Sequence, residues 1–251
     1  MQPSSRFRIR GFDIDVLTLA DFVRVVSIAS KADRPQIIAN HNLHSVYLYH
    51  VSDAMKEFYS RADYVYTDGM GLVVLARILG VPLSRANRLT CLDCLRPILA
   101  EAALEGRRVF HLGGKQGVGV RGAEHLRRRY PYLQITTAHG YFDDRPGSED
   151  NRKVLQALWT YRPDILLVGM GMPRQERWIV NHLGQLPPCA ILSVGAYMDY
   201  VAGEVPAAPR WMGKAGLEWL FRLCAEPRRL WRRYLVEPWF VLWLLFGGYS
   251  G

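Results

Sequence analysis

The stretch Ile165-Leu-Leu-Val-Gly-Met-Gly-Met-Pro-Arg-Gln-Glu176 passes from an apolar run through two glycines into a polar, helix-forming segment. An unbroken apolar run that ends at glycine is typical of a strand buried on both faces of a parallel sheet. The same order recurs where Arg108–Leu112 meets Gly113 and where Ala190–Val194 meets Gly195. The repeated succession of strand, glycine turn and helix predicts an α/β fold built on a parallel sheet.

Two further apolar runs, Gln36–Ala39 and Tyr64–Tyr66, complete a set of five predicted buried strands. A short leading strand is expected around Asp13-Ile-Asp15. The proline-containing stretch Val205–Pro209 ends the alternation, so we expect an α/β core over residues 1–205 and a helical appendage over 206–251. Apolar residues at helical spacing predict helices at Asp53–Arg61, Leu72–Leu79, Cys94–Leu104, Val118–Tyr130, Asn151–Tyr161 and Arg174–Leu183.

The basic charge of the chain is concentrated near its end. With 49% hydrophobic and 22% charged residues among 251, the composition excludes a disordered chain. The net charge is +9, and residues 207–251 alone hold seven basic residues against three glutamates, together with five of the seven tryptophans. Clustered basic and tryptophan residues favour an anionic membrane surface as a partner. No nucleic-acid-binding motif is present, so nucleic acid is not an expected partner.

The sequence predicts a cytoplasmic protein that lies on the membrane without crossing it. The N-terminus lacks the apolar segment of a secretory signal. The longest apolar run of the appendage, Trp239–Phe246, is eight residues long, against roughly 18 needed to span a bilayer. The four cysteines are scattered and form no disulfide framework.

The glycine turns predict a nucleotide pocket. In open α/β sheets, ligands bind beyond the carboxyl ends of the strands, where helix N-termini favour phosphate. Gly117–Gly122 matches G-x-G-x-x-G but begins five residues after its strand ends, whereas the dinucleotide fingerprint forms the strand-to-helix turn itself. A P-loop motif is absent from the sequence. These turns favour a sugar nucleotide over NAD, and an NAD-type oxidoreductase remains the alternative enzyme.

Polar residues follow two of the predicted strands. Asn40-His-Asn42-Leu-His44 follows one, and Thr67-Asp-Gly follows the other. Asp68-Gly69 is a common turn pair, but a carboxylate at a strand end beside a nucleotide pocket can also act as a general base. The spacing of His41, His44 and His50 matches no usual metal site, which favours hydrogen-bonded polar histidines.

Ordered motifs over about 200 residues resemble the WecG/TagA/CpsF family of bacterial glycosyltransferases. The core motifs are Asn40-x-Asn42, Ala62-Asp63, Asp68-Gly-x-Gly71, Phe110-x-Leu-Gly-Gly114, Pro163-Asp164, Gly169-x-Gly-x-Pro-x-Gln-Glu176, Gly195-x-x-x-Asp199 and Ala202-Gly203. Those nearer the end are Ala208-Pro-x-Trp211, Gly216-Leu-Glu-Trp219, Arg222-Leu, Glu226-Pro-x-Arg229 and Arg232-Arg-Tyr234.

The resemblance implies a Rossmann-like glycosyltransferase core with a C-terminal helical appendage that associates with the membrane. It implies inverting transfer of a hexose from a UDP-sugar to a saccharide on polyprenyl diphosphate, for surface glycan synthesis at the cytoplasmic membrane face. The hexose would be glucose, N-acetylmannosamine or N-acetylmannosaminuronic acid. By the same resemblance Asp68 is the base, Asn42 lies near the donor sugar and Asn40 stands where many members have threonine. The implied UDP-binding residues are Gly113, Gly114, Gly169, Gly171, Gln175, Glu176, Gly195 and Asp199.

The resemblance also assigns arginines of the appendage to the acceptor diphosphate: Arg222, Arg229 and Arg232, with Arg233 adjacent. Positions 222, 229 and 233 share one helical face if Pro227 starts a new turn. Guanidinium groups suit diphosphate because they bind oxygens bidentately. A solvated basic face is the alternative for these arginines. A short core helix is the alternative to an interfacial anchor at Trp239–Phe246.

One position departs from the family pattern. Many members show Arg-x-x-Gly-x-Asp where this chain reads Arg88-Leu-Thr-Cys91-Leu-Asp93, so Cys91 replaces a glycine while Arg88 and Asp93 remain site candidates. No Asp-x-Asp occurs in a metal-binding context. We therefore expect metal-independent activity without a cofactor. A nonenzymatic membrane-surface protein is the further alternative.

Overall fold

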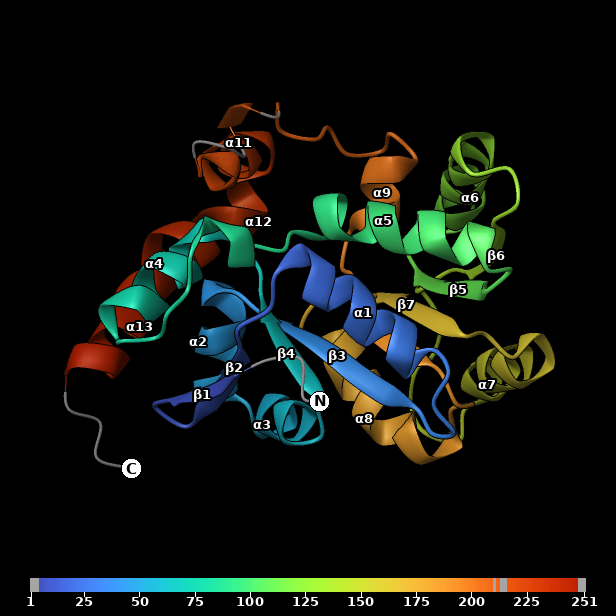
Figure 1. Cartoon of the computed structure of the whole chain (residues 1–251), viewed down its shortest axis with the longest axis horizontal. Coiled ribbons are helices and arrows are strands. Elements are labelled where there is room, and N and C mark those ends of the chain that lie inside the picture. The colour runs from blue at the N-terminus through green and yellow to red at the C-terminus, as the bar shows by residue number, and fades with distance from the viewer. Residues whose placement is uncertain (1–4, 210, 213–215, 248–251) are drawn as a thin grey trace.

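The computed structural model describes residues 5–209, 211–212 and 216–247. Six parallel strands form the central sheet in the order β4-β3-β8-β7-β5-β6 (Figure 1). An antiparallel hairpin of β1 (Arg6–Ile9) and β2 (Phe12–Asp15) forms a separate two-stranded sheet. The bounds of the central strands are Gln36–His41 for β3, Tyr64–Thr67 for β4, Arg108–Gly113 for β5, Gln134–Ala138 for β6, Ile165–Gly169 for β7 and Ala190–Ser193 for β8.

The predicted α/β class and all five predicted buried strands are confirmed. The apolar runs identified these strands because they are covered on both faces. In the central sheet, the strand that the sequence did not predict is β6, which lies at the sheet edge and has Thr136 to Ala138 only half-buried. Its polar composition therefore lacks the apolar signal of its neighbours. Strand β1 of the hairpin was not predicted either.

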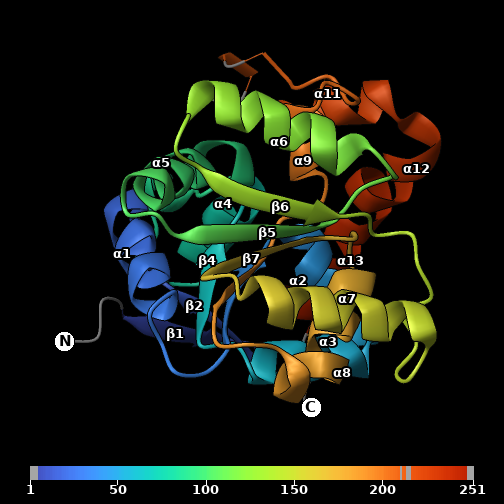
Figure 2. The same cartoon turned by 90° about the vertical axis from the view of Figure 1, so that its right-hand side faces the viewer.

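Helices cover both faces of the central sheet (Figure 2). One layer packs Phe22, Leu95 and Met198 against the sheet; the other packs Phe58, Leu158 and Trp178 against its opposite face. All six predicted helices are present, with ends shifted by up to three residues. The first layer comprises α1 (Leu19–Ala29), α5 (Cys91–Leu104), α6 (Val118–Arg129) and α9 (Tyr197–Val201), and the second comprises α3 (Asp53–Ser60), α7 (Glu149–Tyr161) and α8 (Arg174–His182).

A third apolar cluster joins the hairpin to the end of the chain. It contains Phe12 of β2, Val46 of α2 (Leu43–Val51), Leu72 of α4 (Met70–Ile78) and Val241 of α13 (Glu237–Phe246). The segment that contains Val241 thus has a packed face, as a core helix would. Its other face is open, because Trp239 and Trp243 are 72% and 58% exposed.

The C-terminal helices lie beyond the carboxyl ends of the strands. In Figure 2, the arrow of β6 points toward the side of the molecule on which α12 lies. The last elements are α11 (Glu218–Ala225), α12 (Pro227–Trp231), a π-helical turn η3 (Arg232–Val236) and α13, while short 3₁₀ turns occur at η1 (Arg85–Asn87) and η2 (Leu183–Gln185). Arg210 and Lys214, two of the predicted basic residues, lie outside the described residues.

All five tryptophans of the last 45 residues are at least 40% exposed. Within the described part of the chain, the helices are too short or too polar to cross a membrane.

Candidate active site

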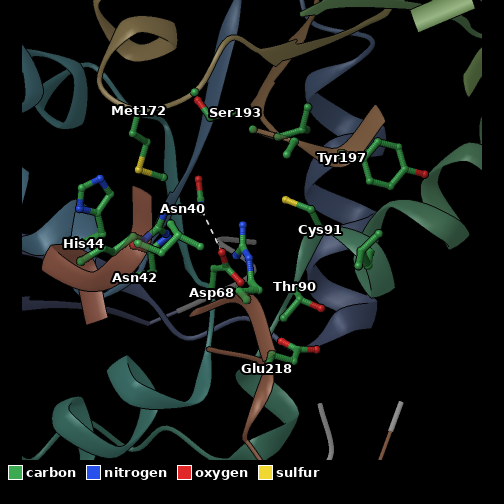
Figure 3. Close-up of a pocket in the computed structure, with 18 of the residues that line it drawn as sticks. Asn40, Asn42, His44, Asp68, Thr90, Cys91, Met172, Ser193, Tyr197 and Glu218 are labelled. Atoms are coloured by element: carbon green, nitrogen blue, oxygen red, sulfur yellow. Dashed lines mark hydrogen bonds between the residues drawn. The ribbon is translucent and has the colours of Figure 1, made fainter. Parts of the chain in front are cut away.

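A crevice opens between the carboxyl ends of the adjacent strands β3 and β8. The chain leaves β3 toward α2 and α3 but leaves β8 toward α9 on the opposite face, and such a divergence is where open α/β sheets bind ligands. The cavity there has a volume of about 510 Å³ (Figure 3). The C-terminal helices cover this cavity, so residues from both ends of the sequence line it.

Ten of the predicted site residues line this cavity. They are Asn40, Asn42, Asp68, Gly171, Gln175, Gly195, Arg222, Arg229, Arg232 and Arg233.

Asp68 is held at the end of β4 by its neighbours in the chain. Gly69 has φ +89° and ψ 147°, a backbone conformation that side chains disfavour, and this turn leads directly into α4. The Asp68 amide donates to the carbonyl of His41 at 2.7 Å, which ties the strand end to β3. The Asp-Gly pair is therefore a turn, as expected from its composition, and the same turn presents the carboxylate to the cavity.

The carboxylate of Asp68 lies close to amides and cations. Asn40 Nδ2 donates to Asp68 Oδ2 at 3.4 Å, as the dashed line in Figure 3 marks. Burial raises the pKa of Asp68, while the charges of Arg222 and Arg233 and a hydrogen bond from Asn42 oppose that rise. A carboxylate with a raised pKa is a stronger proton acceptor than an exposed one.

Asn42 lines the cavity and is held in place at the start of α2. Its side-chain oxygen accepts from the amide of Ser45 at 3.0 Å, and its own amide donates to Ser45 Oγ at 2.8 Å, which caps the N-terminus of α2. Asn40 is held in place because Tyr59 Oη donates a hydrogen bond to its backbone carbonyl at 2.7 Å. Both asparagines thus have positions set by the fold.

Hydrogen bonds of the Gln175 side chain hold the turn after β7 in place. The amide of Gly171 donates to Gln175 Oε1 at 3.2 Å, and Gln175 Nε2 donates to Glu176 Oε1 at 2.7 Å. Glu176 is fully buried, and burial raises its pKa to about 7. Its Oε2 has no hydrogen-bond partner among the described residues.

Five of the predicted nucleotide-binding residues do not line this cavity: Gly113, Gly114, Gly169, Glu176 and Asp199. Gly113 and Gly169 serve the packing of adjacent strand ends. A Cβ atom at Gly113 would lie 2.3 Å from the carbonyl oxygen of Gly169, and one at Gly169 would lie 2.6 Å from that of Gly195. These contacts require glycine at both positions.

The predicted arginines come from separate helical segments. Glu226 interrupts the helix with φ −135° and ψ 60°, and Pro227 begins α12, so Arg222 does not share one continuous helix with Arg229 and Arg233. All of them nevertheless reach the same cavity. Arg222 and Arg233 are partly buried beside Asp68, whereas Arg229 and Arg232 are exposed at the rim.

A second cavity of about 560 Å³ is also lined by Asp68. Arg88 lines it and is 3.2 Å from Glu218 and 3.5 Å from Asp93. Asp93 lines neither cavity and also accepts from Thr90 Oγ1 at 3.0 Å. The two cavities share Asn42, His44, Asp68, Glu218, Arg222 and Arg233.

Several lining residues were not predicted from the sequence as site residues. His44 Nδ1 lies 2.5 Å from Glu237 Oε2, so this histidine has the polar partner that was expected. Cys91 lines the first cavity with its sulfur 3.7 Å from the hydroxyl of Tyr66. Glu218 lies in the motif Gly216-Leu-Glu-Trp219 but was not named as a site residue. Glu237 carries no local signal, because only the folding of the C-terminal helices over the sheet brings it here.

The described residues contain no group of three His, Cys, Asp or Glu side chains placed to hold a metal ion. Asp144, one of the acidic pair at 143–144, is paired with Arg174 at 2.8 Å.

Comparisons with known proteins identify the family of the chain. The chain is 28% identical over 231 residues to the N-acetylglucosaminyldiphosphoundecaprenol N-acetyl-beta-D-mannosaminyltransferases of Staphylococcus aureus strains MRSA252 and NCTC 8325, covering 91% of this chain and 88% of each relative. The profile of the Glycosyl transferase WecG/TagA/CpsF family matches residues 7–249. The alternatives of an NAD-type oxidoreductase and a nonenzymatic binding protein are thereby set aside, and the chain is a glycosyltransferase that belongs to the WecG/TagA/CpsF family.

Proposed function

We propose that this glycosyltransferase moves a hexose from a UDP-sugar to a saccharide carried on polyprenyl diphosphate, with inversion at the anomeric carbon. The observation that carries the proposal is the placement of Asp68, a carboxylate of raised pKa that lines both cavities beside partly buried arginines. Among the three donor sugars that the resemblance implies, the names of the relatives favour N-acetylmannosamine.

In the proposed reaction, Asp68 accepts the proton of the acceptor hydroxyl. The hydroxyl oxygen then forms a bond to the anomeric carbon while the bond from that carbon to the UDP oxygen breaks, and UDP leaves with the electron pair. Because attack and departure take place on opposite faces of the sugar in one displacement, the anomeric configuration inverts. General-base assistance of this kind contributes roughly 10²–10⁴ to a rate.

The donor occupies the first cavity in this proposal. Gly171, Gln175 and Gly195 offer backbone and amide groups to it directly. Gly113, Gly114 and Gly169 shape the strand ends next to these residues. Glu176 accepts a hydrogen bond from the side-chain amide of Gln175, and Asp199 lies against Gly114. Asn42 and Asn40 would contact the sugar near Asp68.

We further propose that the reaction needs neither metal nor cofactor, because Arg222, Arg229, Arg232 and Arg233 line the donor cavity and can neutralise the charge that develops on the leaving UDP. The family resemblance assigns these four arginines to the acceptor diphosphate. If EDTA abolishes turnover and Mg²⁺ or Mn²⁺ restores it, the metal-independent proposal is wrong.

We propose the cytoplasmic membrane face as the working location. The exposed tryptophans of the C-terminal helices and the basic residues beside them suit an anionic lipid surface. Co-sedimentation with vesicles that contain anionic lipid, but not with neutral vesicles, is the expected result. Equal recovery with both vesicle types would contradict the electrostatic part of this proposal.

The test of the function uses the full chain with a panel of UDP-sugars and N-acetylglucosaminyl diphosphoundecaprenol as acceptor. Mass spectrometry of the lipid product identifies the sugar transferred, and NMR of the new linkage gives its configuration. We expect addition of one hexose, with N-acetylmannosamine preferred and the configuration inverted. No lipid product from any UDP-sugar would overturn the proposal.

A further inference from the structure

The second cavity combines two kinds of lining. Its charged lining residues are Asp68, Glu218 and four arginines, of which Arg85 and Arg88 do not line the first cavity. Its remaining wall is mainly apolar. The side chains that form this wall are Leu43, Met70, Leu72, Val74, Trp219, Tyr234 and Pro238.

The apolar wall extends to the surface of the molecule. Leu72 is buried, whereas Val74 on α4 is 52% exposed and Trp219 on α11 is 40% exposed. One turn beyond Val74, Ile78 is 65% exposed on the same face of α4. A path lined by hydrocarbon therefore runs from the exterior to a group of cations beside the candidate base.

This arrangement fits an amphiphile whose anionic group is joined directly to hydrocarbon. The lining holds four arginines and two carboxylates, while Asp93 contacts Arg88 from outside the lining, and guanidinium groups suit a diphosphate. A free sugar nucleotide has no hydrocarbon to cover Val74 and Trp219. The cavity is also of the size that ligand pockets usually have, roughly 300–1,000 Å³.

We propose that the second cavity binds the diphosphate and the adjoining isoprene units of the acceptor, with Arg85 and Arg88 as phosphate contacts and α4 and α11 as the lipid-facing walls. This inference rests on the proposed function, because it assumes that the acceptor is a polyprenyl diphosphate. It adds α4, which lies outside the C-terminal segment, to the surface that meets the lipid.

The arginines then divide between the two substrates. Arg229 and Arg232 line only the first cavity, so they would contact the donor diphosphate, in contrast to the acceptor role that the family resemblance assigns to them. Arg222 and Arg233 line both cavities and would serve the phosphates on either side of Asp68. The resulting order is UDP, transferred sugar, Asp68, acceptor sugar, diphosphate and isoprenoid.

The lipid-facing wall is tested with Val74→Asp. The matched control is Val120→Asp on α6, because Val120 is 54% exposed and lines neither cavity. Each variant is assayed with N-acetylglucosaminyl diphosphoundecaprenol in detergent and with the same sugar diphosphate on a short unbranched alkyl chain. We expect Val74→Asp to raise the KM for the polyprenyl acceptor roughly fivefold more than the KM for the short-chain acceptor, and Val120→Asp to change neither.

The charged end is tested with Arg85→Ala and Arg229→Ala, both at exposed positions. Loss of one charge-assisted phosphate contact should raise the KM of the affected substrate roughly tenfold or more. Arg85→Ala should raise the KM for the acceptor, and Arg229→Ala the KM for the UDP-sugar.

If the wild type transfers the sugar but Val74→Asp and Val120→Asp have the same KM values for both acceptors, this inference is overturned and the proposed function stands. An Arg85→Ala variant that affects only the KM for the donor would have the same consequence. Absence of wild-type transfer to either acceptor would overturn the proposed function and this inference together.

Discussion

The imidazole Nδ1 of His44 lies 2.5 Å from Glu237 Oε2, which joins the first turn of α2 to the first turn of α13 across 193 residues of sequence. Both side chains are largely buried, at 17% and 13% exposed. The contact fixes the last helix beside the two cavities, because His44 lines both of them. The C-terminal helices are thereby linked to the strand ends that carry the candidate site.

Removing the carboxylate of this pair should weaken the attachment of α13. Glu237→Ala leaves a buried imidazole without its partner, and we expect the free energy of unfolding to fall by about 1–3 kcal/mol. Urea denaturation followed by tryptophan fluorescence measures the change. The control is Glu149→Ala, which removes the exposed pair of Glu149 with Lys153 and should leave the urea midpoint nearly unchanged. Equal shifts in the two variants would contradict a special role for the His44 pair.

Glu176 should make stability depend on pH. Burial raises the pKa of its carboxyl from the ordinary 4.5 to about 7, so the folded state keeps a proton that the unfolded state has already released. This contribution to stability is complete below about pH 4.5 and is lost as the pH rises to about 7, a difference of about 3 kcal/mol. Glu176→Gln removes the titrating group and can still accept from Gln175. Urea midpoints at pH 5 and 7.5 should therefore differ less in the variant than in wild type; an identical pH dependence would contradict this role.

Arg222 should hold down the pKa of Asp68. Its charge opposes the rise that burial causes, so Arg222→Gln should shift the acid limb of the kcat profile to higher pH, because a base loses activity once it is protonated. Arg228→Gln serves as the control, since Arg228 is exposed and lines neither cavity. If the acid limb of the kcat profile of Arg222→Gln stays in place or moves to lower pH, the charge of Arg222 does not lower the pKa of Asp68.

Gly69 should be intolerant of a side chain although no neighbouring atom fills the space. A Cβ atom there meets nothing within 4 Å, but φ is +89°, so Gly69→Ala carries only backbone strain of about 1–2 kcal/mol. We expect this loss of stability together with reduced turnover, because the same turn presents Asp68. Gly184→Ala, at an open position without positive φ, should be neutral or slightly stabilising. The measurements are thermal unfolding and kcat, and a fully active Gly69→Ala would contradict the positioning role of this turn.

The sequence predicts best what depends on local pattern. Buried runs such as Ile165–Val168 identify the central strands because a strand covered on both faces needs apolar side chains at every position. The helix Leu19–Ala29 was not predicted, although Thr18 and Asp21 form a capping box that marks its start. The edge strand β6 gave no such signal, since part of its surface is polar and half-exposed.

The candidate site could be predicted only where residues follow strand ends. Asn40, Asn42 and Asp68 lie together because the carboxyl ends of parallel neighbours meet at one edge of the sheet. The contacts of Glu218 with Arg88 and of Glu237 with His44 depend on how the C-terminal helices pack, and no spacing in the sequence encodes them. The sequence also does not show that Gly113 packs against Gly169. It therefore could not separate the glycines that pack the strand ends from those that line the cavity.

The most direct test of the central claim is the single-turnover rate of Asp68→Asn with saturating UDP-sugar and polyprenyl-diphosphate acceptor, measured beside the affinity of the variant for the UDP-sugar. Asparagine keeps the size of the side chain but cannot accept the proton. We predict a rate lower by roughly 10²–10⁴ with little change in donor affinity. Equal single-turnover rates for wild type and Asp68→Asn would contradict the assignment of Asp68 as the base.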